Sequence, residues 1–161
     1  MKYVVPSDLY YTKEHEWAAV VNESGEGKLV KVGVTDYAQS KLGDVVYAVL
    51  PSRKSYKKGD VLAELEAYKG VSEVYAPVSG EVVEVNGSLG SSPELVNQDP
   101  YGKGWIALIR PTDLEGEISS LLRAKDYEAF ILGLKRRITD KKSVRTVIRG
   151  RRPRYAANDR C

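Results

Sequence analysis

A lysine followed by a glycine interrupts a long alternating stretch of the chain, and this pattern constrains the fold more than any other feature. The run GDVLAELEAYKGVSEVYAPVSGEVVEV, residues 59–85, alternates apolar and polar side chains on both sides of Lys69 and Gly70. Alternation with a period of two is typical of half-buried β-strands, and a glycine allows the backbone of a tight turn to take a positive φ. The sequence therefore predicts a β-hairpin with Lys69 exposed at its tip.

Further short alternating runs precede and follow this hairpin, separated by Gly, Pro, Ser or Lys. Many short strands at near-regular spacing indicate a mostly-β antiparallel sandwich or flattened barrel. Thr35 is expected to cap a short helix that ends at Gly43, and Ser92 is expected to cap another that begins at Pro93. The apolar spacing from Leu114 to Leu122 predicts one helical face, so a C-terminal helix is expected to close the fold.

Composition excludes several classes of protein. The longest apolar stretches, such as VVYAVL at residues 45–50, fall far short of the roughly 20 residues that cross a bilayer, so no membrane association is expected. Acidic residues near the start are unlike a transit peptide, and cytoplasmic localisation is expected. Cys161 is the single cysteine and His15 the single histidine, so neither a disulfide within the chain nor a metal site is expected. No nucleophile elbow or phosphate-binding loop occurs, and the chain is not expected to be an enzyme.

Charge divides the chain into two parts. Residues 135–161 hold eleven Lys or Arg against two Asp, a net charge of +9, whereas residues 1–134 hold 14 basic against 20 acidic residues, a net charge of −6. The basic segment has no sustained apolar period and is expected to be a disordered tail beyond a folded domain of residues 1–134. It could instead bind a polyanion without sequence specificity or dock on an acidic partner; specific nucleic-acid binding is not expected.

Four blocks of the sequence occur in the order and spacing of a known family. The chain resembles the H-protein of the glycine cleavage system from about Tyr11 to Leu134, through YTKEHEW (11–17), VGVTDYAQSKLGDVVYAVLP (32–51), SEVYAPVSGEVVEVN (72–86) and SPELVNQDPYGKGWIALIRPTD (92–113). This resemblance implies a flattened hybrid of barrel and sandwich, like a lipoyl domain, with short helices. It also implies that the hairpin lysine is joined by an amide to lipoic acid.

The resemblance places the lipoyl attachment on Lys69, with (R)-lipoate as the covalently bound cofactor. The family's tip reads Glu-Ser-Val-Lys-Ala, whereas this chain reads Glu66-Ala67-Tyr68-Lys69-Gly70. The matching Glu66 supports modification, while Tyr68 and Gly70 depart from the family and are expected to alter recognition by the lipoyl ligase or transferase. A biotin carrier is the neighbouring alternative, but its lysine is flanked by methionines, and Met1 is the only methionine of this chain.

The same resemblance implies a carrier that is not itself a catalyst. The lipoyl arm would take the aminomethyl group of glycine from the pyridoxal-phosphate decarboxylase (P-protein) to the tetrahydrofolate-dependent aminomethyltransferase (T-protein). Electrons would pass to dihydrolipoyl dehydrogenase (L-protein). Two alternatives remain open: a related lipoyl carrier that serves lipoate transfer or sulfur-compound oxidation, and an unmodified interaction module that leaves Lys69 bare.

A cleft that shields the loaded arm from water is also expected. By resemblance, Glu14 and His15 line this cleft, with Glu16 beside them in KEHEW. The alternative is that Trp17 belongs to the core while the charges before it form a solvated strand edge.

Overall fold

The structure is a computed structural model that describes residues 3–23, 25 and 27–134. Residues 1–127 form one compact unit, which contains every strand described below, and a second unit begins at residue 128. Residues 124–134 are helical. The basic tail expected at residues 135–161 lies outside the described residues, so the boundary expected at residue 134 stays a prediction.

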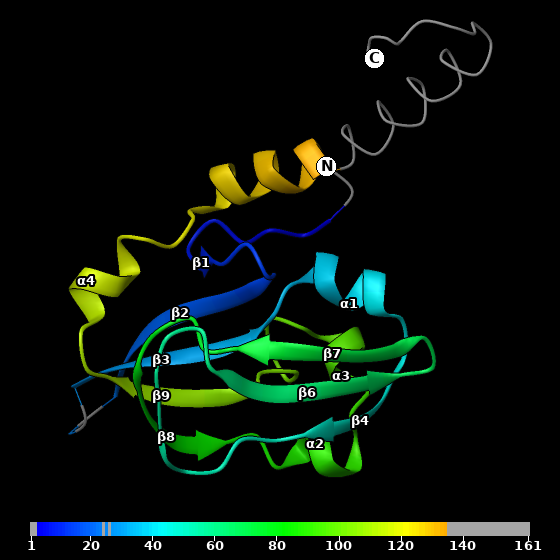
Figure 1. Ribbon diagram of the computed structural model, residues 1–161, viewed down its shortest axis with the longest axis horizontal. Helices are drawn as coiled ribbons and strands as arrows, with labels where there is room; N and C mark the ends of the chain where they lie inside the picture. Colours follow the sequence, from blue (N-terminus) through cyan, green and yellow to red (C-terminus); the bar gives the residue numbers. More distant parts are fainter. Residues whose placement is uncertain (1–2, 24, 26, 135–161) are drawn as a thin grey trace, which may run out of the picture. The chain divides into compact units, whose positions relative to one another are not determined.

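Two antiparallel sheets make up the fold (Figure 1). The larger sheet has the strand order β1-β2-β3-β9-β8-β5, and the smaller sheet has the order β4-β6-β7. The strands are β1 (Tyr10–Tyr11), β2 (Glu16–Glu23), β3 (Gly27–Val34), β4 (Val45–Val49), β5 (Ser55–Tyr56), β6 (Val61–Ala67), β7 (Gly70–Tyr75), β8 (Gly80–Val85) and β9 (Ala107–Pro111). Since β2 pairs with β3 over eight residues and β6 pairs with β7 across a tight turn, consecutive hairpins account for much of the pairing.

One hydrophobic core lies between the sheets, because alternate residues of both point inward. Val30, Val32 and Ile109 of the larger sheet and Leu65 and Val74 of the smaller one belong to the same buried cluster. Trp17 is also buried, and its indole Nε1 donates a hydrogen bond of 3.0 Å to the carbonyl oxygen of Pro100. The mostly-β fold with a C-terminal helix that the sequence predicts is therefore confirmed.

Short helices connect the strands: α1 (Asp36–Leu42), α2 (Ser88–Ser91), α3 (Leu95–Gln98) and α4 (Leu114–Ile118). Helix α1 begins and ends as expected. The side chain of Thr35 accepts a hydrogen bond from the backbone N–H of Ala38, and Gly43 ends the helix with φ of 85°. The cap is isolated from water, because Thr35 is fully buried.

Two expectations about helices are wrong. Ser92 does not cap a helix that begins at Pro93: it is the C-terminal cap of α2, and α3 begins at Leu95 after Glu94. The helical face expected from Leu114 to Leu122 ends at Ile118, and Leu122 instead pairs with Tyr11 through two backbone hydrogen bonds of 2.8 Å. A turn at residues 12–15 separates β1 from β2, since the chain must reverse direction there for the two strands to pair antiparallel.

Candidate functional site: the hairpin tip and an adjoining pocket

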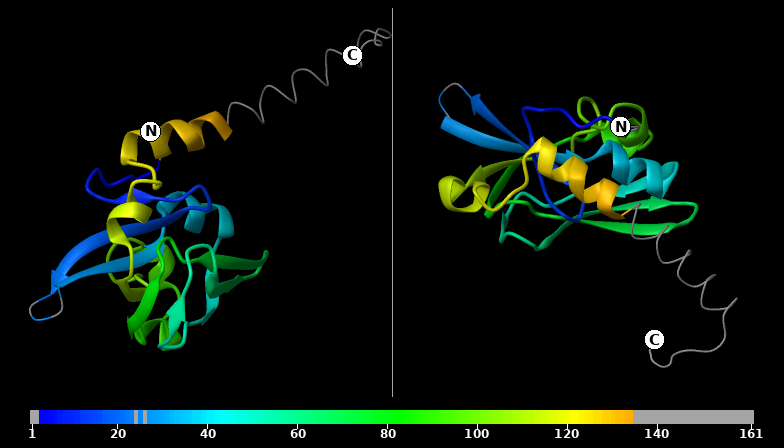
Figure 2. Two further views of the ribbon diagram at one scale, coloured as in Figure 1. Left: turned by 60° about the vertical axis from the view of Figure 1, so that its left-hand side comes forward. Right: turned by 90° about the horizontal axis from the view of Figure 1, so that it is seen from above.

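Lys69 lies in a two-residue turn between β6 and β7. The register pairs Ala67 with Gly70, so only Tyr68 and Lys69 form the loop. Gly70 has φ of 151°, a backbone conformation that residues with a side chain rarely adopt, so the glycine allows the tight turn at the tip. The hairpin projects from the rest of the sheet in both views of Figure 2. The expectation of an exposed lysine at a hairpin tip is therefore confirmed.

The side chain of Lys69 runs over the end of α1. A Cβ atom added to Gly43 would lie 3.7 Å from the Cε atom of Lys69. Below this contact, the side chain of Asn97 donates hydrogen bonds to the carbonyl oxygen of Gly43 (2.8 Å) and to the side-chain oxygen of Gln39 (3.0 Å), and it accepts one from the N–H of Val45 (2.9 Å). Asn97 therefore fixes the backbone on which Lys69 rests, a role that its place in a predicted helix did not indicate.

The three residues near Lys69 that were expected to affect recognition by the modifying enzyme differ in their exposure to solvent. Tyr68 is 86% exposed, so its ring is not laid back on the sheet. Glu66 lies on β6, opposite both Tyr47 of β4 and Val71 of β7, and is half-buried. Gly70 is exposed at the start of β7. A modifying enzyme that reaches Lys69 would meet all three.

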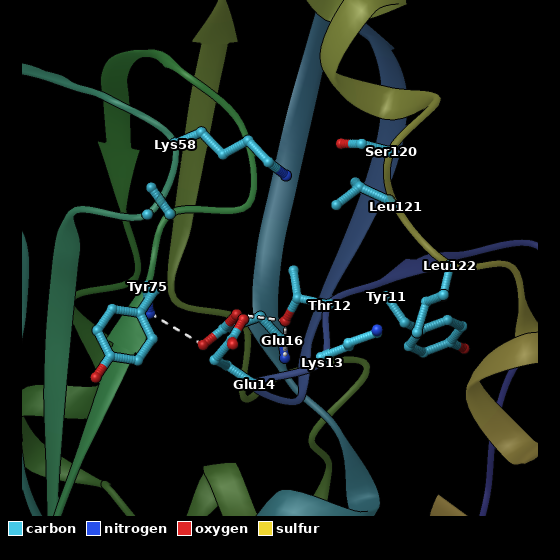
Figure 3. Close-up of a pocket in the computed structure, with 12 residues that line it drawn as sticks. Tyr11, Thr12, Lys13, Glu14, Glu16, Lys58, Tyr75, Ser120, Leu121 and Leu122 are labelled. Atoms are coloured by element: carbon cyan, nitrogen blue, oxygen red, sulfur yellow. Dashed lines mark hydrogen bonds between the residues drawn. The ribbon is translucent and has the colours of Figure 1, made fainter. Parts of the chain in front are cut away.

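A pocket of about 300 Å³ opens at the other end of β7 (Figure 3). Its polar lining includes Glu14, Glu16 and Lys58, and its apolar wall includes Leu121 and Leu122; the remaining lining residues are Tyr11, Thr12, Lys13, Gly59, Tyr75, Ala76 and Ser120. Since Lys69 and Tyr75 are six residues apart on an extended strand, the tip and the pocket are about 20 Å apart. A carboxylate-bearing pocket beside an apolar wall can hold a chain that ends in an amine.

Glu16 is the buried acid of this pocket. Its carboxylate accepts a hydrogen bond of 3.0 Å from the backbone N–H of Tyr75 and another of 2.5 Å from the hydroxyl of Thr12. Burial raises the pKa of Glu16 to about 7, and these two hydrogen bonds oppose the rise. Glu16 therefore joins the turn before β2 to the end of β7, at the far end of the hairpin that carries Lys69.

Of the two residues expected in a cleft, Glu14 lines the pocket, whereas His15 is not among its lining residues. His15 has φ of 76°; its Nδ1 is 2.8 Å from the hydroxyl of Tyr127, and its ring lies 4.7 Å from that of Tyr37. Burial lowers the pKa of His15, and the nearby charge of Glu14 partly opposes this. His15 thus holds the turn that carries both glutamates.

Other kinds of site find no support in the part of the chain that the structure describes. No group of three or more His, Cys, Asp or Glu side chains there is placed to hold a metal ion. None of the described helices has the length and apolar character to cross a membrane. The candidate functional residues lie at the two ends of β7, with Lys69 at one end and the pocket at the other.

The chain is similar to known proteins over most of its length. The family model described as "Glycine cleavage H-protein" matches residues 9–133. A probable glycine cleavage system H protein of Pyrococcus abyssi is 54% identical over 134 residues, which cover 83% of this chain and 96% of the relative. A glycine cleavage system H protein of Thermus thermophilus is 51% identical over 128 residues, which cover 79% of this chain and 95% of that relative.

The fold is likewise similar to a solved structure. The crystal structure of a glycine cleavage system H protein from Mycobacterium marinum superposes with a TM-score of 0.68 at 37% identity and covers 78% of this chain and 97% of that one. Sequence and fold agree, and the chain therefore belongs to the glycine cleavage H-protein family, whose members are non-catalytic lipoyl carriers of the glycine cleavage system.

Proposed function

We propose that Lys69 carries the lipoyl group, (R)-lipoate, as an amide on its Nζ atom. The observation that carries this proposal is an exposed lysine in the two-residue turn of a projecting hairpin, in a chain of this family. Amide formation joins Nζ to the lipoyl carbonyl carbon, the group that activated the carboxyl leaves, and the ammonium group of Lys69 gives up two protons. The positive charge of Lys69 is therefore abolished.

The attachment is tested by intact mass and peptide mapping of protein from cells with active lipoylation. We expect one lipoyl amide, located on Lys69, and its loss in Lys69→Arg. Lys57→Arg is the matched control, because Lys57 is an exposed lysine close to the hairpin but outside its turn. An unmodified Lys69 in such cells would contradict the proposal.

As a carrier, the protein acts with the P-, T- and L-proteins of the glycine cleavage system. The bound lipoyl group would supply a dithiolane that exchanges two electrons and a sulfur that carries the aminomethyl group of glycine. The chain itself would present the arm: the two-residue turn fixes its base, and the lysine stem passes close to Gly43 at the end of α1. In a reconstituted system, lipoylated protein should support glycine-dependent NAD reduction, and Lys69→Arg should not.

We further propose that a cleft shielding the end of the arm lies along β7 rather than in the pocket with Glu14 and Glu16. A lysyl-lipoyl arm of about a dozen ångströms laid along β7 would extend about as far as Glu73, whereas the pocket lies about 20 Å from the hairpin tip. Glu14→Gln should therefore leave the rate at which the aminomethyl group is lost to water as it is in Glu84→Gln, at an exposed position of β8. Faster loss in Glu14→Gln alone would show that the arm does reach the pocket.

The alternative of a lipoyl carrier for lipoate transfer or sulfur-compound oxidation is motivated by Tyr68 and Gly70, where the tip departs from the family pattern. Glycine-dependent activity with the three enzymes would decide against it. Cytoplasmic localisation is also proposed, since a chain with the single cysteine Cys161 needs no oxidising compartment. Cell fractionation would test this.

A further inference from the structure

We propose that the outer face of the β4-β6-β7 sheet is the docking surface for the enzyme that acylates Lys69; this rests on the proposed function. The face is called the tip face below. Its members are the outward-pointing residues Tyr47, Val49, Glu64, Glu66, Val71 and Glu73. Figure 1 shows β6 and β7 side by side, with the turn that carries Lys69 at one end.

Strand register arranges the tip face in two rows across the sheet. Tyr47, Glu66 and Val71 are direct partners across β4, β6 and β7, and they form the row nearer the turn. Val49, Glu64 and Glu73 form the next row. Directly paired residues point to the same side of a sheet, so each row is a continuous strip of side chains.

The apolar members of these rows are exposed. Tyr47 is 54%, Val49 41% and Val71 60% exposed, although strand residues with large apolar side chains are normally buried on a core face. Clustered exposed apolar side chains on a sheet, bordered by polar ones, are typical of a protein-binding surface. The tip face has this composition and lies beside the lysine.

The short length of the lysine side chain indicates which enzyme must bind the tip face. An enzyme that forms a bond at Nζ must bring its active site within about 6 Å of the backbone of Lys69, since five bonds separate Nζ from Cα. It must therefore cover the turn and the nearest row, which contains Tyr47, Glu66 and Val71. Enzymes that act on the far end of a lipoyl arm work about a dozen ångströms away and can leave this row uncovered.

Charge defines the chemistry of the partner surface. The strands β4, β6 and β7 contain no lysine or arginine, while Glu64, Glu66 and Glu73 stand between the apolar side chains of the tip face. A complementary surface is apolar at its centre and carries Lys or Arg where it meets these carboxylates. The acylating enzyme is therefore expected to have a basic rim around its lysine entrance.

The test measures lipoate transfer to the purified full chain by a lipoate–protein ligase with ATP and lipoate, followed by intact mass at varied carrier concentration. We expect Tyr47→Ser and Val71→Ser each to raise the KM for the carrier about tenfold with little change in kcat, as for loss of a central interface contact. Val20→Ser is the matched control on β2, where Val20 is 37% exposed, and it should stay within about twofold of wild type.

Variants with reversed charge provide a second, independent test in the same assay. Glu64→Lys should raise the KM at least as much as Val71→Ser, and the effect should shrink as salt is added. Glu84→Lys, at an exposed position of β8, is its control and should be acylated like wild type. Thermal unfolding of every variant separates a docking defect from misfolding.

Each result has a defined meaning. Normal acylation of all tip-face variants overturns the inference while leaving the proposed function intact, even where a variant then fails with the decarboxylase. Self-association of wild type that tip-face variants abolish would assign the face to a second copy of this chain and also overturn it. A wild-type protein that is never acylated would overturn both proposals.

Discussion

At the scale of single residues, the protonation of Glu16 in the pocket should make the stability of the fold depend on pH. Burial raises its pKa from 4.5 to about 7, so between these values the folded protein holds a proton that the unfolded chain releases. The free energy of unfolding should therefore fall as pH rises from 4.5 through 7, by roughly 3 kcal/mol from this group. Below pH 4.5 both states are protonated, and Glu16 contributes no further change.

Denaturant unfolding of wild type and Glu16→Gln across this range checks the prediction. Glutamine can still accept from the N–H of Tyr75 while its amide donates to Thr12, so the variant should keep the fold and lose this part of the pH dependence. His15, whose pKa burial lowers, acts with the opposite sign in both proteins and cancels in the difference. Parallel curves for the two proteins would show that Glu16 titrates normally.

Tyr68 should slow acylation by a ligase whose usual substrates have valine at this place. The ring is 86% exposed beside Lys69 and would have to fit into the ligase cleft. Tyr68→Val should therefore raise the initial rate of lipoylation several-fold with such a ligase, measured by intact mass over time. Equal rates for the two proteins would mean that the ligase tolerates any side chain at this position.

The exposed lysine at the hairpin tip could be predicted from the sequence, but much of the pocket could not. Lys69 stands between two alternating runs, so its exposure follows from local pattern alone. Glu16 is a single charge in a charged stretch, and its burial depends on β7, 59 residues further along the chain. The role of Asn97 could not be predicted either, because its side chain contacts α1 and β4, which are distant from it in the sequence.

At the scale of elements, the hydroxyl of Tyr127 joins three segments. It lies 2.8 Å from His15 Nδ1 in the turn before β2 and 2.8 Å from the buried hydroxyl of Thr35 that caps α1. The Tyr127 ring also stacks on that of Tyr11, with centroids 4.7 Å apart. Tyr127→Phe keeps the stacking and removes both hydrogen bonds, so it should lower the free energy of unfolding by about 1–3 kcal/mol in urea.

Tyr68→Phe is the control for this change, since it removes a hydroxyl from a side chain that is 86% exposed and should stay within about 0.5 kcal/mol of wild type. Equal stabilities of both variants and wild type would mean that water replaces the lost partners of Tyr127 at no cost.

Elements with strong local signals could be predicted, whereas those defined by distant contacts could not. The β6–β7 hairpin and the Thr35 cap follow from alternation and from capping chemistry within a few residues. The turn at residues 12–15 and the early end of α4 both depend on the bridge between Tyr11 and Leu122, which lie 111 positions apart. No periodicity in either segment specifies that pairing.

At the scale of the whole molecule, the basic segment beyond Leu134 should be dispensable for the carrier function. The family match covers residues 9–133, and residues 135–161 carry a net charge of +9 with few apolar residues. Ordering such a segment would cost about 1–2 kcal/mol per residue with little apolar area to offset it. Truncation after Leu134 should leave the Tm and the lipoylation of Lys69 nearly unchanged.

Comparison of the truncated and full-length proteins at low and moderate salt tests this. Any partner bound by the basic segment should be anionic, and its binding should weaken steeply with added salt. A large loss of thermal stability on truncation at both salt concentrations would show that the segment packs on the folded domain.

The two-residue turn also limits the volume that the proposed lipoyl arm on Lys69 could occupy. An arm of about a dozen ångströms held at this base would explore only the hemisphere above the turn, and one dithiolane in a hemisphere of that radius corresponds to a local concentration on the order of 0.1 to 1 M. An enzyme docked within that hemisphere can therefore have a Michaelis constant for the dithiolane in the tens of millimolar and still be saturated. The same enzyme would hardly respond to free lipoamide at micromolar concentration.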